Sequence, residues 1–153
     1  LIPPSPIPAI PLPEKNMMLF YDYLARMGCA FVMGTLIGIE RQYRQRNAGL
    51  RTNILVSVGA AAFTVLSCDM TIGNGDPSRV AAQIVSGIGF LGAGVIFVKD
   101  DLIQGLTTAA GMWTTSGIAA CIGAGLIFIG VFVIVLITCA ASFSNFMRGL
   151  CTI

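Results

Sequence analysis

Five long apolar stretches, separated by short polar connections, dominate this sequence. They cover residues 19–39, 52–69, 80–98, 107–122 and 126–143. A helix needs roughly 20 mainly apolar residues to cross the hydrocarbon core of a bilayer. Only 10% of the 153 residues are charged, whereas soluble domains average about 25%, so the charges are too few to cover a water-exposed surface. The pattern therefore predicts an all-α polytopic membrane protein with five transmembrane helices and packing rich in small residues.

The fourth stretch is the least clear, because threonine and alanine make up much of it. The alternative is a protein with four transmembrane helices, in which residues 107–122 are re-entrant or only partly inserted. In either case residues 17–146 form the predicted transmembrane domain, and residues 147–153 form a short cytoplasmic C-terminus.

The first 16 residues fall outside this pattern. They hold six of the seven prolines, and closely spaced prolines oppose both helix and central strand. Residues 1–16 are therefore predicted to be a disordered or polyproline-II-like tail, or a start assigned too far ahead of Met17.

Basic residues gather at one connection. Arg41, Arg44, Arg46 and Arg51 lie between the first and second stretches. Lysine and arginine near helix ends favour the cytoplasmic side of a membrane. We therefore expect this loop and the C-terminus to be cytoplasmic, and the N-terminus to be outside.

Glycines recur at helical spacing within two of the stretches. Gly34 and Gly38 form a G-x-x-x-G motif, which lets helix backbones approach closely in lipid. Gly89 and Gly92 belong to a second glycine-rich run in the third stretch. Our interpretation is tight helix packing, and the alternative is a crossing that leaves room for an ion or a lipid headgroup.

Few ionisable side chains lie within the apolar stretches. Asp22 and Arg26 are four residues apart and can pair on one helix face. Glu40 is either an anchor at the membrane boundary or a partner for Arg51 or for another protein. Asp76 or Ser78 is a candidate cap for the third helix.

The sequence argues against an enzyme. It contains no histidine and no C-x-x-C pair, and no paired carboxylates lie at mid-membrane depth. We therefore predict no catalytic residue, no metal ligand, no cofactor and no nucleic-acid partner. Trp113 is expected to fill a helix contact. The candidate functional residues are Glu40, Arg41, Arg51, Asp76, Arg79, Gln83, Gly89, Gly92, Thr107, Thr108 and Trp113.

Three blocks of the sequence resemble the signatures of the MgtC/SapB family. They read GTLIGIERQYRQRNAGLRTN over residues 34–53, DPSRVAAQIVSGIGFLGAGVI over residues 76–96, and GLTTAAGMW over residues 105–113. The resemblance spans about Met17 to Phe143. Three ordered blocks at matching spacing are far more specific than a lone motif.

The resemblance implies a bacterial inner-membrane virulence factor that supports growth at low magnesium and survival inside macrophages. The family picture is regulatory, with action on membrane ATPases such as the F-type ATP synthase or a P-type ATPase. The family is not known to catalyse a reaction, so no catalytic residue is carried over.

Two departures from the family pattern matter. Members usually continue into a cytoplasmic domain of ACT-like fold, so this chain is expected to be a membrane-domain-only member or a truncated product. Gln104 and Thr107 stand where the family motif carries arginine and asparagine. The resemblance associates that asparagine with ATP-synthase contact, which places this activity in question here.

Three functions follow as hypotheses. A regulatory protein that binds an ATPase predicts exposed small-residue grooves and no continuous polar pore. A transporter or channel component for magnesium or another ion predicts a polar cavity, in a monomer or a homo-oligomer. An enzyme acting on lipid is disfavoured by the residue types just described.

Overall fold

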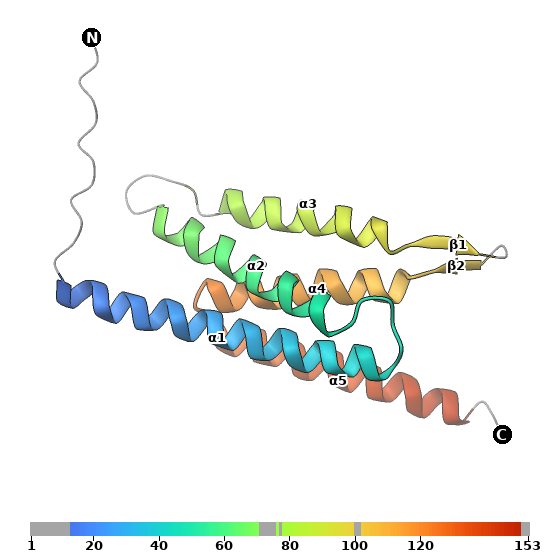
Figure 1. The fold of residues 1–153 in the computed structure, drawn as a ribbon. Coiled ribbons are helices and arrows are strands. Elements are labelled where there is room, and N and C mark those ends of the chain that lie inside the picture. Colours follow the sequence, from blue (N-terminus) through green and yellow to red (C-terminus); the bar gives the residue numbers. More distant parts are fainter. Residues whose placement is uncertain (1–12, 71–75, 77, 100–101, 151–153) are drawn as a thin grey trace, which may run out of the picture.

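The computed structural model describes residues 13–70, 76, 78–99 and 102–150. They form five helices and one short antiparallel hairpin, in the order α1 (Pro13–Tyr43), α2 (Leu50–Met70), α3 (Ser78–Gly94), β1 (Phe97–Lys99), β2 (Leu102–Gln104), α4 (Leu106–Gly123) and α5 (Ile127–Leu150). Successive helices run in alternating directions (Figure 1). The α1–α2 turn, the hairpin and the end of α5 therefore lie at one end of the bundle, which we call the arginine end.

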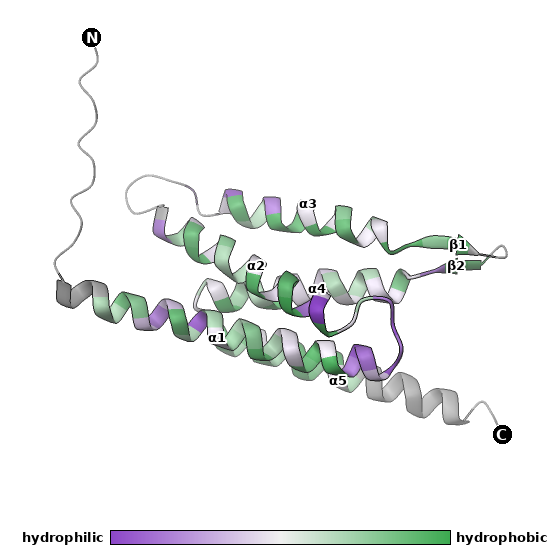
Figure 2. Ribbon diagram, viewed as in Figure 1, coloured by the Kyte–Doolittle hydropathy of each residue, from purple (hydrophilic) through white to green (hydrophobic). Residues whose placement is uncertain are grey.

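The described helices are apolar on their outer surfaces as well as inside. Phe31, Leu36, Phe90 and Phe132 are each at least half exposed, and Figure 2 shows apolar residues along most of each helix, with hydrophilic residues concentrated at the α1–α2 turn. A helix that is apolar all round is solvated by lipid or buried in protein. This surface agrees with the predicted membrane protein.

Two of the described helical segments are long and apolar enough to cross a membrane, Met17–Tyr43 and Leu50–Asp69. A shorter apolar segment covers Ile127–Cys139. The helical fold and its candidate membrane spans thus follow the sequence prediction. The count of five spans stays a prediction.

Helices α2 and α4 are central. Helix α1 packs mainly on α2, α4 packs on α2, and α3 and α5 each pack against α4. The fully buried residues at their junction are small or aliphatic, namely Ala30, Ala61, Ala119 and Ile122. Small side chains let the helix axes approach, which is how helices associate when lipid supplies no hydrophobic drive.

The G-x-x-x-G motif of α1 lies at the closest of these crossings. A Cβ atom on Gly34 would lie 2.7 Å from Cβ of Ser57, and one on Gly38 would lie 2.8 Å from Cα of Leu50. The Ser57 hydroxyl crosses the same gap and donates a hydrogen bond of 2.6 Å to the Ala30 carbonyl oxygen. Tight packing is therefore confirmed for α1 against α2.

The glycines of α3 behave differently. A Cβ atom on Gly87, Gly89 or Gly94 would have no neighbour within 4 Å among the described residues, and Gly92 meets only Ala109 at 3.6 Å. Among the described residues, the prediction of tight packing is therefore wrong for Gly87, Gly89 and Gly94, which leave the surface of α3 open. It holds for Gly92, which is buried and packs on α4.

The third helix ends at Gly94, four residues before the predicted boundary, and a hairpin follows it. Phe97 pairs with Gln104 and Val98 pairs with Ile103. Glycines weaken the end of the helix, and the β-branched residues after Gly94 favour extended backbone. Gly105 closes the hairpin with φ of 92°, where any Cβ would clash with the Val95 carbonyl oxygen.

Two further boundaries differ from the prediction. Helix α1 begins at Pro13, inside the tail predicted over residues 1–16, because proline is well accommodated in the first turn of a helix. Residues 1–12 lie outside the described part of the chain. Helix α5 continues to Leu150, past the predicted end of the transmembrane domain at residue 146.

Candidate functional site

Two of the three signature-like blocks meet at the arginine end. The Nη2 atom of Arg41, near the end of α1, donates a hydrogen bond of 3.1 Å to the carbonyl oxygen of Thr107 in α4. Gly111 lies beneath the guanidinium, since a Cβ there would be 3.4 Å from Cζ of Arg41. The structure therefore brings the candidates Arg41 and Thr107 together, and a glycine one turn along α4 makes room for the arginine.

Glu40 forms an ion pair with Arg44, with 2.8 Å between Oε1 and Nε. The alternative pairing of Glu40 with Arg51 is wrong. Helix α1 continues to Tyr43, and this places Arg44 one turn from Glu40, where such pairs form. Both side chains are more than a third exposed, so the pair contributes less than about 1 kcal/mol. Arg51 lies exposed at the start of α2.

Asn53 is the polar residue that the sequence reasoning missed. Its side chain is 1% exposed, and its Nδ2 atom donates to the carbonyl oxygens of Ala48 at 3.2 Å and Gly49 at 2.8 Å. Its Oδ1 atom accepts a hydrogen bond of 3.3 Å from Thr115. Asn53 thus holds the α1–α2 turn, α2 and α4 together. The available signal was an amide inside an apolar stretch, at the last position of the first signature-like block.

A cavity of about 90 Å³ lies between α1, α4 and α5 at the arginine end, and we call it the polar cavity after the five polar residues in a lining that is otherwise mainly aliphatic. Its polar lining consists of Glu40, Arg41, Thr114, Thr115 and Thr138. That volume is large enough to hold ordered water. Further into the bundle, Ile118 and Ile122 are buried, so the polar lining gives way to aliphatic side chains.

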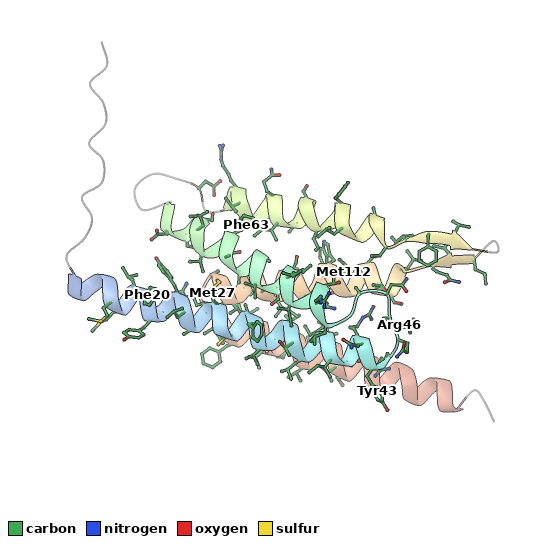
Figure 3. The ribbon with its side chains drawn as sticks, viewed as in Figure 1. Phe20, Met27, Tyr43, Arg46, Phe63 and Met112 are labelled. Carbon is green, nitrogen blue, oxygen red and sulfur yellow. The ribbon has the colours of Figure 1, made fainter. Side chains whose placement is uncertain are left out.

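A larger apolar groove of about 350 Å³ runs between α2 and α3. Leu55, Gly59 and Phe63 of α2 form one wall, and Figure 3 labels Phe63 on α2. The other wall comes from α3, with Val80, Gln83, Ile84, Gly87, Ile88 and Leu91. Neither Gly59 nor Gly87 would bring a Cβ within 4 Å of another group in the described chain. The groove is therefore open enough to admit bulk at both glycines.

Comparison with known proteins identifies the family. The MgtC family model matches residues 27–150. The chain belongs to the MgtC family. Protein MgtC of Brucella abortus (strain 2308) is 58% identical over 98 residues, which cover 64% of this chain and 41% of that protein. Protein MgtC of Salmonella typhimurium (strain LT2) is 49% identical over 126 residues, which cover 82% of this chain and 54% of that protein.

This MgtC family chain spans about half the length of the relatives it matches. No solved structure matches it. The matched residues 27–150 include α2 to α5 and most of α1, so the polar cavity, the apolar groove and Asn53 all lie within the family region.

At the opposite end of this MgtC family fold, Arg26 holds the α4–α5 turn. Its Nη2 atom lies 2.6 Å from Oδ2 of Asp22, which confirms the predicted pairing on one helix face. Its Nη1 atom donates a hydrogen bond of 2.9 Å to the Gly123 carbonyl oxygen. Nearby, the Tyr23 hydroxyl donates to Asp69 at 2.8 Å and links α1 to α2. These contacts hold neighbouring helices together and have a structural role.

Asp76 caps the first turn of α3. Its Oδ1 atom accepts a hydrogen bond of 2.9 Å from the Ser78 N–H. Hydrogen bonding to the Ser78 side chain, and then to its backbone N–H, holds the pKa of Asp76 below the usual carboxyl value. Of the two predicted capping residues, the structure selects Asp76. Arg79 is exposed beside it, and only its backbone N–H is bonded to the Asp76 carbonyl oxygen, at 3.4 Å.

The remaining candidates do not share one site. Thr108 is buried and Gly92 packs on Ala109, whereas Gly89 is exposed on α3. Trp113 is 55% exposed, so it does not fill a buried helix contact among the described residues. The inward face of α4 is set by residues such as Met112 and Thr115, and position 113 turns away from it.

Proposed function

We propose that this MgtC family protein is a regulatory protein of the bacterial inner membrane that binds a transmembrane helix of a membrane ATPase. Through that partner it supports growth at low Mg²⁺ and survival inside macrophages, as a virulence factor. The observation that carries this proposal is the apolar groove between α2 and α3, with its open glycines.

Glycine within a helix needs a compensating reason, because it is about 1 kcal/mol less favourable than alanine. At Gly34 the reason is the crossing with α2, but Gly59 and Gly87 have no such neighbour in the described chain. In lipid, small residues favour association because they let a second helix approach. The backbone of a partner helix accounts for glycines on both walls of one groove.

The groove also supplies a polar contact. Gln83 lines it from α3 and its side chain is exposed. An amide at that position can both donate and accept a hydrogen bond. A polar residue on the partner helix would add direction to an otherwise apolar contact.

The membrane arrangement we propose has five passes, with the N-terminus outside and the C-terminus cytoplasmic. The four arginines between Arg41 and Arg51 are the reason, because positive charge near helix ends is retained in the cytoplasm. The proposal includes no catalysed reaction, no cofactor and no nucleic-acid partner.

The experiment is capture of the ATPase from native membranes by the tagged chain, with Gly87→Leu as the test variant. Leucine at position 87 fills the groove, whereas Gly28→Leu places the same side chain on an equally open position of α1. We expect Gly87→Leu to lose the ATP synthase or P-type ATPase from the eluate and Gly28→Leu to retain it. Equal retention by both variants would rule out the groove as the binding surface.

A second candidate function is a subunit of a transporter for magnesium or another ion, in a monomer or a homo-oligomer. The polar cavity beside Glu40 and Arg41 favours it. Arg41 weighs against a divalent cation there, since like charges repel strongly in a medium of low dielectric constant. Ion flux into liposomes that contain only this purified protein would support transport, and a flux no larger than that of empty liposomes would oppose it.

A further inference from the structure

The hairpin presents apolar side chains that no other described element covers. Val98, Leu102 and Ile103 are each more than 60% exposed. The strand register pairs Val98 with Ile103, so these two share one face of the hairpin. An isolated two-stranded hairpin is marginally stable in water, so an apolar medium on that face would stabilise it.

The length of α3 places the hairpin near the surface of the membrane. Its 17 residues give a helix about 26 Å long, which is shorter than the roughly 30 Å of the hydrocarbon core. The residues that follow Gly94 must complete the crossing. The hairpin then lies at the boundary between acyl chains and headgroups, at the arginine end of the bundle (Figure 1).

A cavity of about 460 Å³ separates the hairpin from the α1–α2 turn. Its lining has an apolar side and a polar side. Ile103 and Leu106 form an apolar side, and Gln45, Arg46, Asn47 and Gln104 supply polar groups. Such a cavity fits a ligand that is polar at one end and apolar at the other.

Arg46 is the uncommitted guanidinium in the described lining of this cavity. Arg44 pairs with Glu40, and Arg41 donates to the Thr107 carbonyl oxygen. Arg46 is exposed, and among the described residues its side chain forms neither an ion pair nor a hydrogen bond. Figure 3 shows it on the connection between α1 and α2. Its charge is therefore available to an anionic group in the cavity.

We propose that this cavity binds the phosphodiester headgroup of an anionic phospholipid, with Arg46 at the phosphate and the acyl chains along the Val98–Ile103 face. The charge of Arg46 complements the phosphate, and the apolar side of the cavity matches the glycerol backbone and the first acyl methylenes. The site rests on the proposed membrane placement, but not on the ATPase partner.

The test is native mass spectrometry of the full chain in detergent, with equal amounts of dioleoylphosphatidylglycerol and dioleoylphosphatidylcholine. We expect the anionic lipid to be retained preferentially. Arg46→Gln should weaken its binding about fivefold, which corresponds to the roughly 1 kcal/mol that one basic residue contributes near an anionic lipid surface. Arg79→Gln changes another exposed arginine, at the other end of the bundle, and should leave binding unchanged.

Two further variants separate charge from folding. Arg46→Lys keeps the charge and should recover most of the binding. Ile103→Ser removes an apolar contact and should weaken both lipids. The site is overturned if both lipids bind equally, if Arg46→Gln and Arg79→Gln behave alike, or if free glycerol phosphate displaces the lipid completely, since a water-soluble phosphate ester would then suffice.

Failure of the lipid site and failure of the proposed function would give different experimental results. Arg46 does not line the α2–α3 groove. Capture of the ATPase should therefore persist in Arg46→Gln when lipid binding is lost.

Discussion

The hydroxyl of Thr115 and the side-chain amide of Asn53 join α4 to α2 inside the bundle. Oγ1 of Thr115 lies 3.3 Å from Oδ1 of Asn53 and 2.9 Å from the Gly111 carbonyl oxygen. The hydroxyl has a single proton, so the two acceptors share it. Both side chains are 1% exposed, and water is therefore unable to replace a lost partner.

Asn53→Ala should destabilise the protein by about 1–3 kcal/mol, the usual penalty when buried groups lose their hydrogen-bond partners. The substitution removes the donor to the Ala48 and Gly49 carbonyl oxygens and the acceptor for Thr115. Thr115→Val should destabilise the protein by less than Asn53→Ala. The measurement is reversible unfolding of the purified protein in mixed micelles.

The double variant gives the control for this pair. If Asn53 and Thr115 bond directly, the two effects should fall short of additive by about 0.6 kcal/mol, a typical coupling for side-chain hydrogen bonds between transmembrane helices. Full additivity would mean that the contact between them contributes nothing.

Gly34→Ala and Gly28→Ala should change stability in opposite directions, although both replace a glycine within α1. A methyl group at position 34 would lie 2.7 Å from Cβ of Ser57 and 2.9 Å from the Asn53 carbonyl oxygen, whereas position 28 has no neighbour within 4 Å. We expect Gly34→Ala to destabilise by about 1–3 kcal/mol through overpacking. Gly28→Ala should stabilise by up to about 1 kcal/mol through helix propensity. Unfolding in the same micelles measures both, and a loss of stability in each variant would contradict the predicted difference.

The role of Gly34 was accessible from the sequence because close helix crossings in lipid have a local signature, two small residues four positions apart. The same signature in α3 was misleading, since spacing alone does not say whether a partner helix lies in the same chain. The hairpin was missed because residues 95–98 are continuously apolar, and such a run fits a helix end as well as a strand.

The candidate site shows the same limit. The Arg41–Thr107 contact joins residues 66 positions apart, and no local pattern encodes that distance. The Asp76 cap, by contrast, joins residues two positions apart, and Asp76 was one of the two predicted capping residues. The role of Asn53 could not be predicted from its own stretch of sequence, because the hydrogen bond that its side chain accepts comes from Thr115 in another helix.

The Asp76 cap should hold the first turn of α3 at neutral pH and release it only in strong acid. Hydrogen bonds to Ser78 keep the pKa of the carboxyl below its ordinary value of 3.8. A depressed folded-state pKa gives stability that is complete above the unfolded value and is lost as pH falls through the folded one. Amide hydrogen exchange at Ser78 and Arg79 should therefore stay protected, relative to Asp76→Ala, down to pH values below 3.8.

Asp76→Asn provides the control, because an asparagine caps a helix without titrating. Its protection should be independent of pH in the same acid range. Loss of protection in the native protein well above pH 3.8 would contradict the assignment of the cap to the ionised carboxylate.

Charge reversal at the α1–α2 turn should weaken its retention on the cytoplasmic side. Arg44→Glu with Arg51→Glu turns the local charge from basic to acidic, and basic residues next to helix ends set the orientation of short loops. The first change also places two carboxylates one turn apart at the end of α1, which destabilises the helix by only about 0.2–0.5 kcal/mol, so the fold should survive.

A cysteine introduced at Tyr43, which is 88% exposed, would report the change in orientation. It would be labelled with a membrane-impermeant maleimide in intact cells, with the native cysteines replaced by serine. We expect labelling in the double variant and none with the native arginines. Arg79→Glu reverses a charge at the other end of the bundle and should leave position 43 protected. If position 43 stays protected in the double variant as well, these arginines do not orient the chain, and the arginine end loses its assignment to the cytoplasmic side.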